Sequence, residues 1–541
     1  MTIHKFTVQL RQGSINIGCI QEQGAREYQE DTVGFTEIPA GGPTDKFLAA
    51  VADGMGGMAS GGFVSDYTVR NLLASDVNSP QELCEAVRRI SGEIAAGGSR
   101  GGTTLAAVCI LSDGVYFCSV GDSRIYLLRG GIMTQLTADA DYMSVLLDRV
   151  ISRELSFVQA AADPECDSLS QYVGSGTLIS PDMNFVPMDI QPGDRLLICS
   201  DGVYNALSDE ELLQSLTLSA GGAAEDILGR IMARGYANQD NYTAVVMQFG
   251  QDWQDVSPVT PALSDETPMY VESARYSGAG GRNVNEDSLY NGGGIYAAAD
   301  GLGGHHGGSA ASAAAVGYLA KHTDGDFSPD GVNELLEGAN DAVCGSGGLS
   351  ALAVAFVRAG VFTCGNVGDC RVYFFRNGKI IYQSRDHSVC QASVELGEMS
   401  WEDIRSSEDR SGLLKALGAG KPLDLRQRCE PIELRPGDGF LVCTDGFWQS
   451  VYEREMETDL IKSRSAAEWL NSMLKRHLLR SHDAGDNYSA VCGVVRTGEA
   501  PAESVDPPKK RFPVRLLISL GVASAAVAGL IVVLLWLLNW L

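Results

Sequence analysis

The stretch LLICSDGVY at residues 196–204 returns as FLVCTDGFW at residues 440–448. In each copy an apolar run ends in an aspartate followed by glycine, Asp201-Gly202 in the first and Asp445-Gly446 in the second. A short apolar run bounded by a turn signal predicts a buried strand that ends at an acidic loop. Because the two aspartates lie 244 residues apart, far more than one solenoid repeat, the pattern predicts one whole domain present twice.

Four further aspartates repeat in the same order. The pairs are Asp31 and Asp287, Asp53 and Asp300, Asp122 and Asp369, and Asp240 and Asp486; Gly54 and Gly301 follow the second pair. The first offset is 256 residues and the other three are 246 or 247. Carboxylates gathered in one cleft repel each other at low dielectric, and a divalent cation removes that repulsion. Oxygen ligands without cysteine or histidine favour Mg²⁺ or Mn²⁺, so we predict a metal site in each half.

Arginine and glycine accompany the aspartates in both copies. Arg26 and Arg282 each lie five residues before the first aspartate of their copy. A guanidinium holds a phosphate dianion through two parallel hydrogen bonds, whereas a single surface arginine is often only solvated. The runs DGMGG (53–57) and DGLGG (300–304) let a backbone approach a metal or a phosphate, although any tight turn is also rich in glycine. Their recurrence favours a phosphate-binding function.

Composition excludes some classes of function. The 541 residues carry a formal net charge of −27, which argues against a nucleic-acid partner because such proteins need a basic surface. The 13 cysteines include no Cys-x-x-Cys pair and most lie in apolar runs, which indicates reduced, buried thiols in a cytosolic protein. The N-terminal residues lack the apolar core of a secretory signal.

The C-terminal segment differs from the rest. Residues 516–538 carry no charge, and such a helix spans a hydrocarbon core of ~30 Å. Lys509, Lys510, Arg511 and Arg515 precede or flank the segment, so the positive-inside rule places the large domains in the cytoplasm. We therefore expect a single-pass tail anchor, and we expect the membrane to be a bacterial inner membrane.

The chain divides into five predicted parts. They are a first domain (1–250), a linker (251–268), a second domain (269–497), a juxtamembrane linker (498–513) and the transmembrane tail anchor (514–541). In the first domain we predict strands at 15–20, 47–51, 105–111, 115–120 and 124–128, and helices at 63–73 and 80–95. Many antiparallel strands with a few helix pairs indicate an α+β layered fold.

Six ordered motifs occur in each half and together resemble the PPM family of metal-dependent Ser/Thr phosphatases, the PP2C type. In the first half they are GAREYQED (24–31), ADGMGG (52–57), GGTT (101–104), VGDSR (120–124), SDG (200–202) and DN (240–241). In the second half they are GRNVNED (281–287), ADGLGGHHGG (299–308), VGDCR (367–371), LLKALG (413–418), TDG (444–446) and DN (486–487). The resemblance implies two four-layer αββα sandwiches in tandem, each a central antiparallel β-sandwich flanked by antiparallel helix pairs.

The resemblance also implies a role for each repeated residue. Asp53 and Asp300 would bridge two Mn²⁺ or Mg²⁺ ions in their respective domains, with the carbonyls of Gly54 and Gly301 as further ligands. The remaining metal ligands would be Asp201 with Asp240 and Asp445 with Asp486, while Asp31 and Asp287 would hold metal-bound water. Asp122 and Asp369 match the aspartate that serves a third, weaker metal in some members. Arg26 and Arg282 would orient phosphoserine or phosphothreonine of a protein substrate for attack by a metal-activated water.

Some positions depart from the family pattern. Asn205 and Gln449 stand where many members carry another aspartate, which weakens a third metal in both halves. Gly348-Leu349-Ser350 replaces Gly-Thr-Thr, and Gln29 replaces the usual asparagine before Glu-Asp. No aspartate of the two-metal set is missing from either half. Two alternatives remain: one domain is catalytic and the other regulatory, or the chain is a non-catalytic scaffold that binds phosphoproteins.

The predicted partners follow from this interpretation. Phosphorylated proteins at the cytoplasmic face of the membrane would be the substrates. Tethering raises the local concentration of the phosphatase near other membrane proteins, so a membrane Ser/Thr kinase is a natural partner.

Overall fold

The computed structural model describes residues 2–38, 43–55, 60–98, 101–176, 179–254, 268–302, 307–420, 422–423 and 429–499. Residues 1–497 form one compact unit. The predicted tail anchor, 514–541, and nearly all of the juxtamembrane linker lie outside the described residues. Among the residues that are described, no helix has the length and apolar character needed to cross a bilayer.

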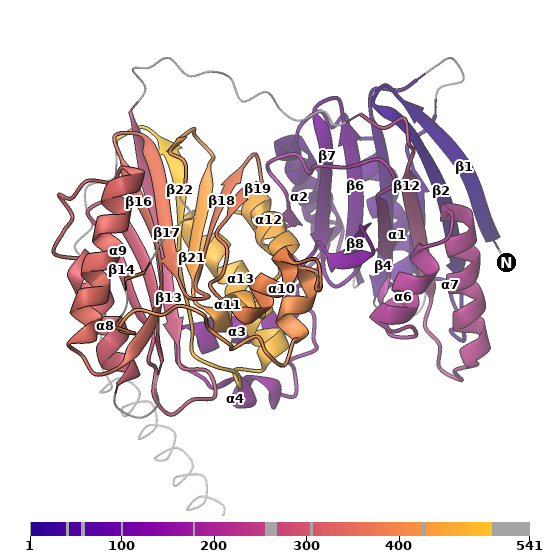
Figure 1. Ribbon diagram of the computed structural model, residues 1–541. Helices are drawn as coiled ribbons and strands as arrows, with labels where there is room; N and C mark the ends of the chain where they lie inside the picture. The colour runs from indigo at the N-terminus through magenta and orange to yellow at the C-terminus, as the bar shows by residue number, and fades with distance from the viewer. Residues whose placement is uncertain are drawn as a thin grey trace, which may run out of the picture. The chain divides into compact units, whose positions relative to one another are not determined.

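The described part of the first half, residues 2–254, contains two antiparallel sheets (Figure 1). One has the order β1 (Thr2–Leu10), β2 (Gly13–Glu22), β12 (Tyr242–Phe249), β11 (Arg195–Cys199), β8 (Arg124–Arg129), β9 (Ile132–Gln135). The other has the order β10 (Asp182–Met183), β7 (Gly114–Val120), β6 (Leu105–Leu111), β4 (Phe47–Met55), β3 (Asp31–Phe35), with β5 (Gly102–Thr103) paired to β4. Strands β6 and β7 are buried at every position, because a sheet covers one face and helices cover the other.

The part of the first half that the structure describes contains seven helices. They are α1 (Ser60–Leu73), α2 (Pro80–Ala96), α3 (Tyr142–Ile151), α4 (Phe157–Ala161), α5 (Asp201–Tyr204), α6 (Asp209–Leu216) and α7 (Ala220–Arg234). Ser79 caps α2 by accepting a hydrogen bond from the backbone of Glu82, and Pro80 takes the first helical position, where its missing N–H costs nothing. Three apolar layers result: α1 and α2 on one sheet, the two sheets on each other, and α6 and α7 on the other sheet.

The second half, described over residues 268–499 with short gaps, repeats this arrangement. One sheet has the order β13 (Met269–Gly278), β22 (Tyr488–Thr497), β21 (Gly439–Cys443), β18 (Arg371–Arg376), β19 (Lys379–Gln383). The other has the order β14 (Ser288–Gly292), β15 (Ile295–Leu302), β16 (Leu349–Arg358), β17 (Val361–Val367), β20 (Ile432–Glu433). The helices are α8 (Gly308–Leu319), α9 (Pro329–Cys344), α10 (Val389–Glu395), the 3₁₀ helix η1 (Glu402–Ser406), α11 (Asp445–Trp448), α12 (Glu453–Lys462) and α13 (Ala466–Ser481).

Most predicted elements of the first half are confirmed, with longer boundaries. The strand predicted at 47–51 continues to Met55, so Asp53 lies within β4 and not after it. The predicted linker also begins too early, because Trp253 is 5% exposed and packs edge-on against Phe249 at a ring distance of 4.7 Å. The absence of periodicity after residue 250 did not reveal this single anchoring side chain. The remaining domain boundaries stay predictions.

The two halves are joined by helices of the first half that pack on the second half. Leu146 and Leu147 of α3 are each 1% exposed and belong to the same buried apolar cluster as Met473 and Leu474 of α13. Around this cluster, Lys475 forms an ion pair with Asp148 at 3.0 Å.

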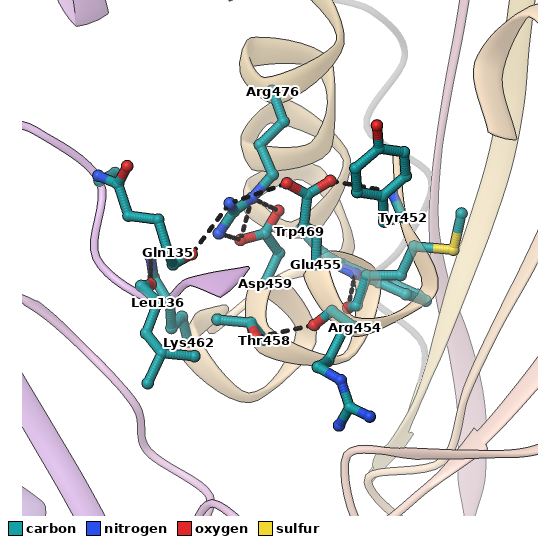
Figure 2. Close-up of polar contacts among 12 residues, drawn as sticks. Gln135, Leu136, Tyr452, Arg454, Glu455, Thr458, Asp459, Lys462, Trp469 and Arg476 are labelled. Atoms are coloured by element: carbon teal, nitrogen blue, oxygen red, sulfur yellow. Dashed lines mark hydrogen bonds and ion pairs between the residues drawn. The ribbon is translucent and has the colours of Figure 1, made fainter. Parts of the chain in front are cut away.

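A second contact lies at the end of β9. Arg476 of α13 donates to the carbonyl of Gln135 at 3.2 Å while its guanidinium is held by Asp459, and Lys462 donates to the carbonyl of Leu136 at 3.1 Å (Figure 2). Because apolar and charged contacts coincide, the segment of the first half that follows β9 is fixed on the second half.

Candidate metal and phosphate site

Asp31 and Asp53 lie opposite each other in the first half. They are register partners at the end of the β3–β4 pair, so both carboxylates lie at the same edge of the sandwich. The side chain of Asp31 is 3% exposed, and its Oδ2 accepts hydrogen bonds from Ser200 at 2.8 Å and Thr243 at 2.7 Å. Its Oδ1 is buried without a hydrogen-bond partner. Burial raises the pKa of Asp31 to about 7 despite these two hydrogen bonds.

Asp201 and Asp240 reach the same place from the first turn of α5 and from the loop before β12. Oδ1 of Asp201 is buried and has no hydrogen-bond partner, whereas its Oδ2 accepts from Asn205 at 3.2 Å. Asp240 forms an ion pair with Arg26 at the exposed rim. Burial and the neighbouring charge of Asp240 raise the pKa of Asp201.

Asp122 lies at the turn after β7. The hydroxyl of Tyr204 donates to the carbonyl oxygen of Asp122 at 3.0 Å. Burial, followed by the charge of Asp201, raises the pKa of Asp122 to about 6. Burial also raises the pKa of Asp53 well above its ordinary value, and the charge of Asp31 is the next largest cause. All five repeated acids of the first half are therefore close enough to influence one another.

The second half brings the corresponding residues together. Asp287 accepts from Thr444 at 3.0 Å, and burial raises its pKa to about 7. Asp300 is adjacent to it across the β14–β15 pair, and burial together with the charge of Asp445 raises the pKa of Asp300 to about 10. At the rim, Arg282 holds Asp486 through two hydrogen bonds, of 3.0 and 2.8 Å.

Asp369 and Asp445 complete the acidic cluster of the second half. Burial, followed by the charge of Asp486, raises the pKa of Asp445 to about 6. Asp369 is 5% exposed, its pKa is raised well above the ordinary value by burial, and its Oδ1 has no hydrogen-bond partner. Oδ2 of Asp445 accepts from Gln449 at 3.0 Å. Asn205 and Gln449 thus use their amides in the same way, each occupying one oxygen of the aspartate four residues before it.

Close backbone packing surrounds Gly54 and Gly301. A Cβ at Gly54 would lie 2.4 Å from the carbonyl carbon of Gly61, and a Cβ at Gly301 would lie 2.3 Å from that of Gly308. Real Cβ contacts do not occur at such distances, so these positions require glycine. The backbone at each predicted carbonyl ligand is therefore held against the first turn of the following helix. Gly61 and Gly308 were not singled out in the sequence, although their 247-residue offset was available.

Other residues that build the site were also missed. Oδ1 of Asn241 accepts from the backbone N–H of Glu30 at 2.7 Å, and Oδ1 of Asn487 accepts from that of Glu286 at 2.8 Å. The amide of Asn487 also donates to the carbonyl of Ala279 at 2.9 Å, which holds the loop that carries Arg282. These asparagines were visible as the second letter of the DN motif, but they are positioning residues and not ligands.

Two sequence departures keep their structural role. Oε1 of Gln29 accepts from the backbone N–H of Asp31 at 3.0 Å, just as Oδ1 of Asn285 accepts from that of Asp287 at 3.0 Å. In the Gly-Leu-Ser variant, Ser350 still donates to the carbonyl of Asp300 at 2.7 Å, as Thr103 does to that of Asp53 at 2.8 Å. The substituted residues therefore make the same hydrogen bonds to the backbone as their counterparts in the other half.

The buried carboxylate oxygens without partners fit a divalent cation. Hard cations take oxygen ligands, and unpaired buried carboxylates are costly unless they are protonated or bound. The described residues nevertheless contain no group of three or more His, Cys, Asp and Glu side chains already arranged as a metal site. The acids form a mutually repelling cluster whose chemistry suits Mg²⁺ or Mn²⁺, and binding itself remains a proposal.

A small cavity adjoins the rim of the first site. It has a volume of about 280 Å³ and is lined by Arg26, Asp240, Asn205 and neighbouring residues of the same half. A guanidinium beside a pocket of this size is suited to bind a phosphate group.

Comparison with known proteins finds similarity to protein phosphatases. The Protein phosphatase 2C family matches residues 30–227. The serine/threonine protein phosphatase PstP of Mycobacterium tuberculosis is 32% identical over 210 residues, which cover 37% of this chain and 40% of PstP. Protein phosphatase PhpP of Streptococcus pneumoniae is 30% identical over 185 residues, which cover 31% of this chain and 72% of PhpP. The fold and the paired acidic clusters thus define a chain that belongs to the protein phosphatase 2C family.

The match spans only two fifths of the length of the mycobacterial relative. Among solved structures, the crystal structure of M. tuberculosis PstP/Ppp is 29% identical, with 44% of this chain and 99% of that chain covered and a TM-score of 0.37.

Proposed function

We propose that this chain hydrolyses phosphoserine and phosphothreonine on proteins with the help of Mn²⁺ or Mg²⁺. The observation that carries the proposal is the repeated site: in each half, burial and neighbouring aspartates raise the pKa of a central aspartate, Asp53 or Asp300, beside an arginine–aspartate pair at the rim. The substrate class is supported by the relatives named serine/threonine protein phosphatases.

The side chains have distinct tasks in this proposal. Asp53, Asp201 and Asp240, with the carbonyl of Gly54, would hold two ions in the first half; Asp300, Asp445 and Asp486, with the carbonyl of Gly301, would hold two in the second. When bound, such ions offset the negative charge of the phosphoryl oxygens and make water more acidic. Asp122 and Asp369 are candidates for a third, weaker ion.

Arg26 and Arg282 would bind and orient the phosphate. Each is paired with an aspartate in the described structure, so a phosphate ester would share or replace that aspartate as the partner. Asp31 and Asp287 would hold the attacking water or its proton at Oδ1, the oxygen without a partner, while Oδ2 is fixed by the neighbouring hydroxyls. This fixed geometry is what orientation-based catalysis requires.

The test is Mn²⁺-dependent hydrolysis of a phosphothreonine peptide by the full-length chain. We expect Asp53→Ala and Asp300→Ala each to remove the turnover of their own half, and the double variant to lose activity by at least ~10³-fold, as expected when an essential site is removed. A double variant that keeps the rate of the unaltered chain would refute the proposal.

A second candidate is a chain with one catalytic and one regulatory half. It is favoured by the family match, which covers residues 30–227 and thus only the first half. In that case Asp53→Ala alone would abolish turnover, and Asp300→Ala would change the rate without removing it. The same pair of variants therefore distinguishes the two candidates.

We also propose that residues 514–541 anchor the chain in a bacterial inner membrane with both halves in the cytoplasm, near a membrane Ser/Thr kinase. The support is the uncharged run at 516–538 with its preceding basic residues. Full-length chain should remain in the membrane fraction after alkaline carbonate washing, and a chain ending at residue 513 should not. Equal release of both would contradict the anchor.

A further inference from the structure

A cavity that is walled partly by the first half adjoins the loop that leads to Arg282. The cavity has a volume of about 560 Å³. Its second-half lining comprises Tyr276, Gly278, Ala279, Gly280, Asn285, Asp483 and Tyr488. Its first-half lining comprises Val150, Arg153, Glu154, Leu155, Ser156 and Gln159. We call this space the inter-half cavity.

The inter-half cavity adjoins the arginine loop of the second site. Residues 278–280 end two residues before Arg282, and Asp483 lies three residues before Asp486, the partner of Arg282. The two loops are joined by a backbone hydrogen bond of 2.9 Å from Gly281 to Gly485. The cavity therefore lies beside the loop that carries the proposed phosphate-binding arginine.

The first-half wall of the cavity is held in place. Arg153 donates to the carbonyl of Ser277 at 2.7 Å, and Phe157 stacks on His482 with ring centroids 5.2 Å apart. Behind these contacts, Leu146 and Leu147 are buried in the cluster shared with α13. The contacts of Figure 2 fix the chain where it leaves β9 and enters this segment. The first-half residues that line the cavity are therefore held against the second half by hydrogen bonding, ring stacking and apolar packing.

The two sites differ in this respect. The cavity beside Arg26 is lined by residues of the first half alone, whereas the cavity beside the Arg282 loop includes residues from both halves. The duplication therefore gave the second site a wall that the first cavity lacks.

We propose that the inter-half cavity binds the polypeptide that flanks the phosphorylated residue in substrates of the second site, with residues 150–159 of the first half as specificity-determining residues. This inference rests on the proposed phosphatase function. The volume lies within the range of ~300–1,000 Å³ that is usual for ligand sites. The half-buried ring of Tyr276, which is stacked on the buried ring of Tyr488, offers an apolar surface, and Arg153, Glu154 and Asp483 offer charges of both signs to a peptide.

The test uses the full-length chain carrying Asp53→Ala, in which turnover comes from the second site. The ratio of kcat/KM for a phosphothreonine peptide to kcat/KM for p-nitrophenyl phosphate, which has no flanking polypeptide, is measured. Arg153→Ala and Gln159→Ala should each lower this ratio roughly three- to tenfold, the loss expected from one or two removed contacts. Val158→Ala, next to Gln159 but 74% exposed and outside the cavity lining, should not, and Arg89→Ala on α2 controls for charge.

Two results would overturn the inference. One is an unchanged ratio in both cavity variants; the other is an equal fall in the Asp300→Ala chain, where only the first site turns over. If the Asp53→Ala chain hydrolyses neither substrate, the proposed function fails for the second site, and binding of a fluorescein-labelled phosphothreonine peptide measured by anisotropy decides the cavity separately. Weaker binding in Arg153→Ala and Gln159→Ala than in Val158→Ala supports the cavity; no binding, or equal binding, overturns it.

Discussion

Arg371 and Asp386 form a two-bonded ion pair in which each side chain is only 1% exposed. The distances are 2.9 Å from Nε and 2.8 Å from Nη2, and the guanidinium lies 3.4 Å above the ring of Trp448. Arg371 belongs to the VGDCR motif, so this pair fixes the strand that begins two residues after Asp369. The first half has the matching pair, Arg124 with Asp139, at 23% and 19% exposure.

The difference in burial predicts a difference in stability. Asp386→Ala leaves a buried guanidinium without its partner and should cost about 3–5 kcal/mol of unfolding free energy. Asp139→Ala leaves a guanidinium that water reaches, so a smaller loss is expected. Denaturant unfolding followed by tryptophan fluorescence measures both. A loss from Asp139→Ala equal to or greater than that from Asp386→Ala would contradict the burial argument.

The repeated aspartates were predictable from the sequence because they recur in the same order at nearly the same offset in the two halves. The same reasoning could have found the Arg–Asp pairs, since Arg124 and Arg371, and likewise Asp139 and Asp386, are each 247 residues apart. An aspartate 15 residues after its arginine belongs to no short motif, so only the constant offset between the two halves marks these pairs in the sequence.

The packing between the halves was not predictable in this way. The buried leucines of α3 have the spacing of any amphipathic helix, and that spacing shows that one face is covered without showing by what. In this chain the element that packs against these leucines is α13 of the second half. A contact that occurs once in a duplicated chain leaves no repeat in the sequence, so the inter-half cavity could be found only from the structure.

Gly61 provides a test of the close packing at the predicted carbonyl ligand. A Cβ there would lie 2.5 Å from Oε1 of Glu30 and 2.7 Å from the carbonyl carbon of Gly54. Gly61→Ala should therefore displace Gly54, lower the turnover of the first site and cost ~1–3 kcal/mol of stability through overpacking. Mn²⁺-dependent turnover in the Asp300→Ala chain, together with a melting curve, measures both effects.

The matched control is Gly92→Ala in α2, where an added Cβ meets nothing within 4 Å. That change should stabilise the chain by about 0.5–1 kcal/mol, because alanine is the better helix former, and should leave turnover as it was. Full activity in Gly61→Ala would show that the predicted ligand does not depend on this contact.

The amides of Asn205 and Gln449 can be tested by adding charge. Asn205→Asp removes the hydrogen bond to Oδ2 of Asp201 and adds a carboxylate beside it. The metal-free chain should lose about 1–2 kcal/mol of stability, and Mn²⁺ should restore more than it does in the unaltered chain. Gln214→Glu, at an exposed position of α6, adds the same charge outside the cluster and should do neither. An Asn205→Asp chain that gains nothing extra from Mn²⁺ would argue against a cation near Asp201.

The raised pKa values of Asp31 and Asp287, each about 7 against an ordinary value of ~3.9, predict how the metal-free chain responds to pH. Between these values the folded state binds more protons than the unfolded state, so the free energy of unfolding falls as pH rises through 7. Lowering the pH from about 8 to 6.5 should therefore stabilise the metal-free chain. The window ends at 6.5 because burial lowers the pKa of both His387 and His477 to about 4, and these groups act in the opposite direction below 6.5.

The measurement is the melting temperature at pH 8.0, 7.2 and 6.5, with chelator and with Mn²⁺. Mn²⁺ should remove most of the pH dependence, since a bound cation stabilises the ionised carboxylates that protons otherwise neutralise. The double variant Asp31→Asn/Asp287→Asn should reduce the slope of the metal-free curve, because an amide does not titrate; the remaining slope comes from Asp53, Asp300 and Asp369, whose pKa values burial also raises. A metal-free chain that becomes less stable between pH 8 and 6.5, or a double variant with the original slope, would show that these two carboxyls do not titrate near neutrality and that the acidic clusters are not poised to exchange protons for cations.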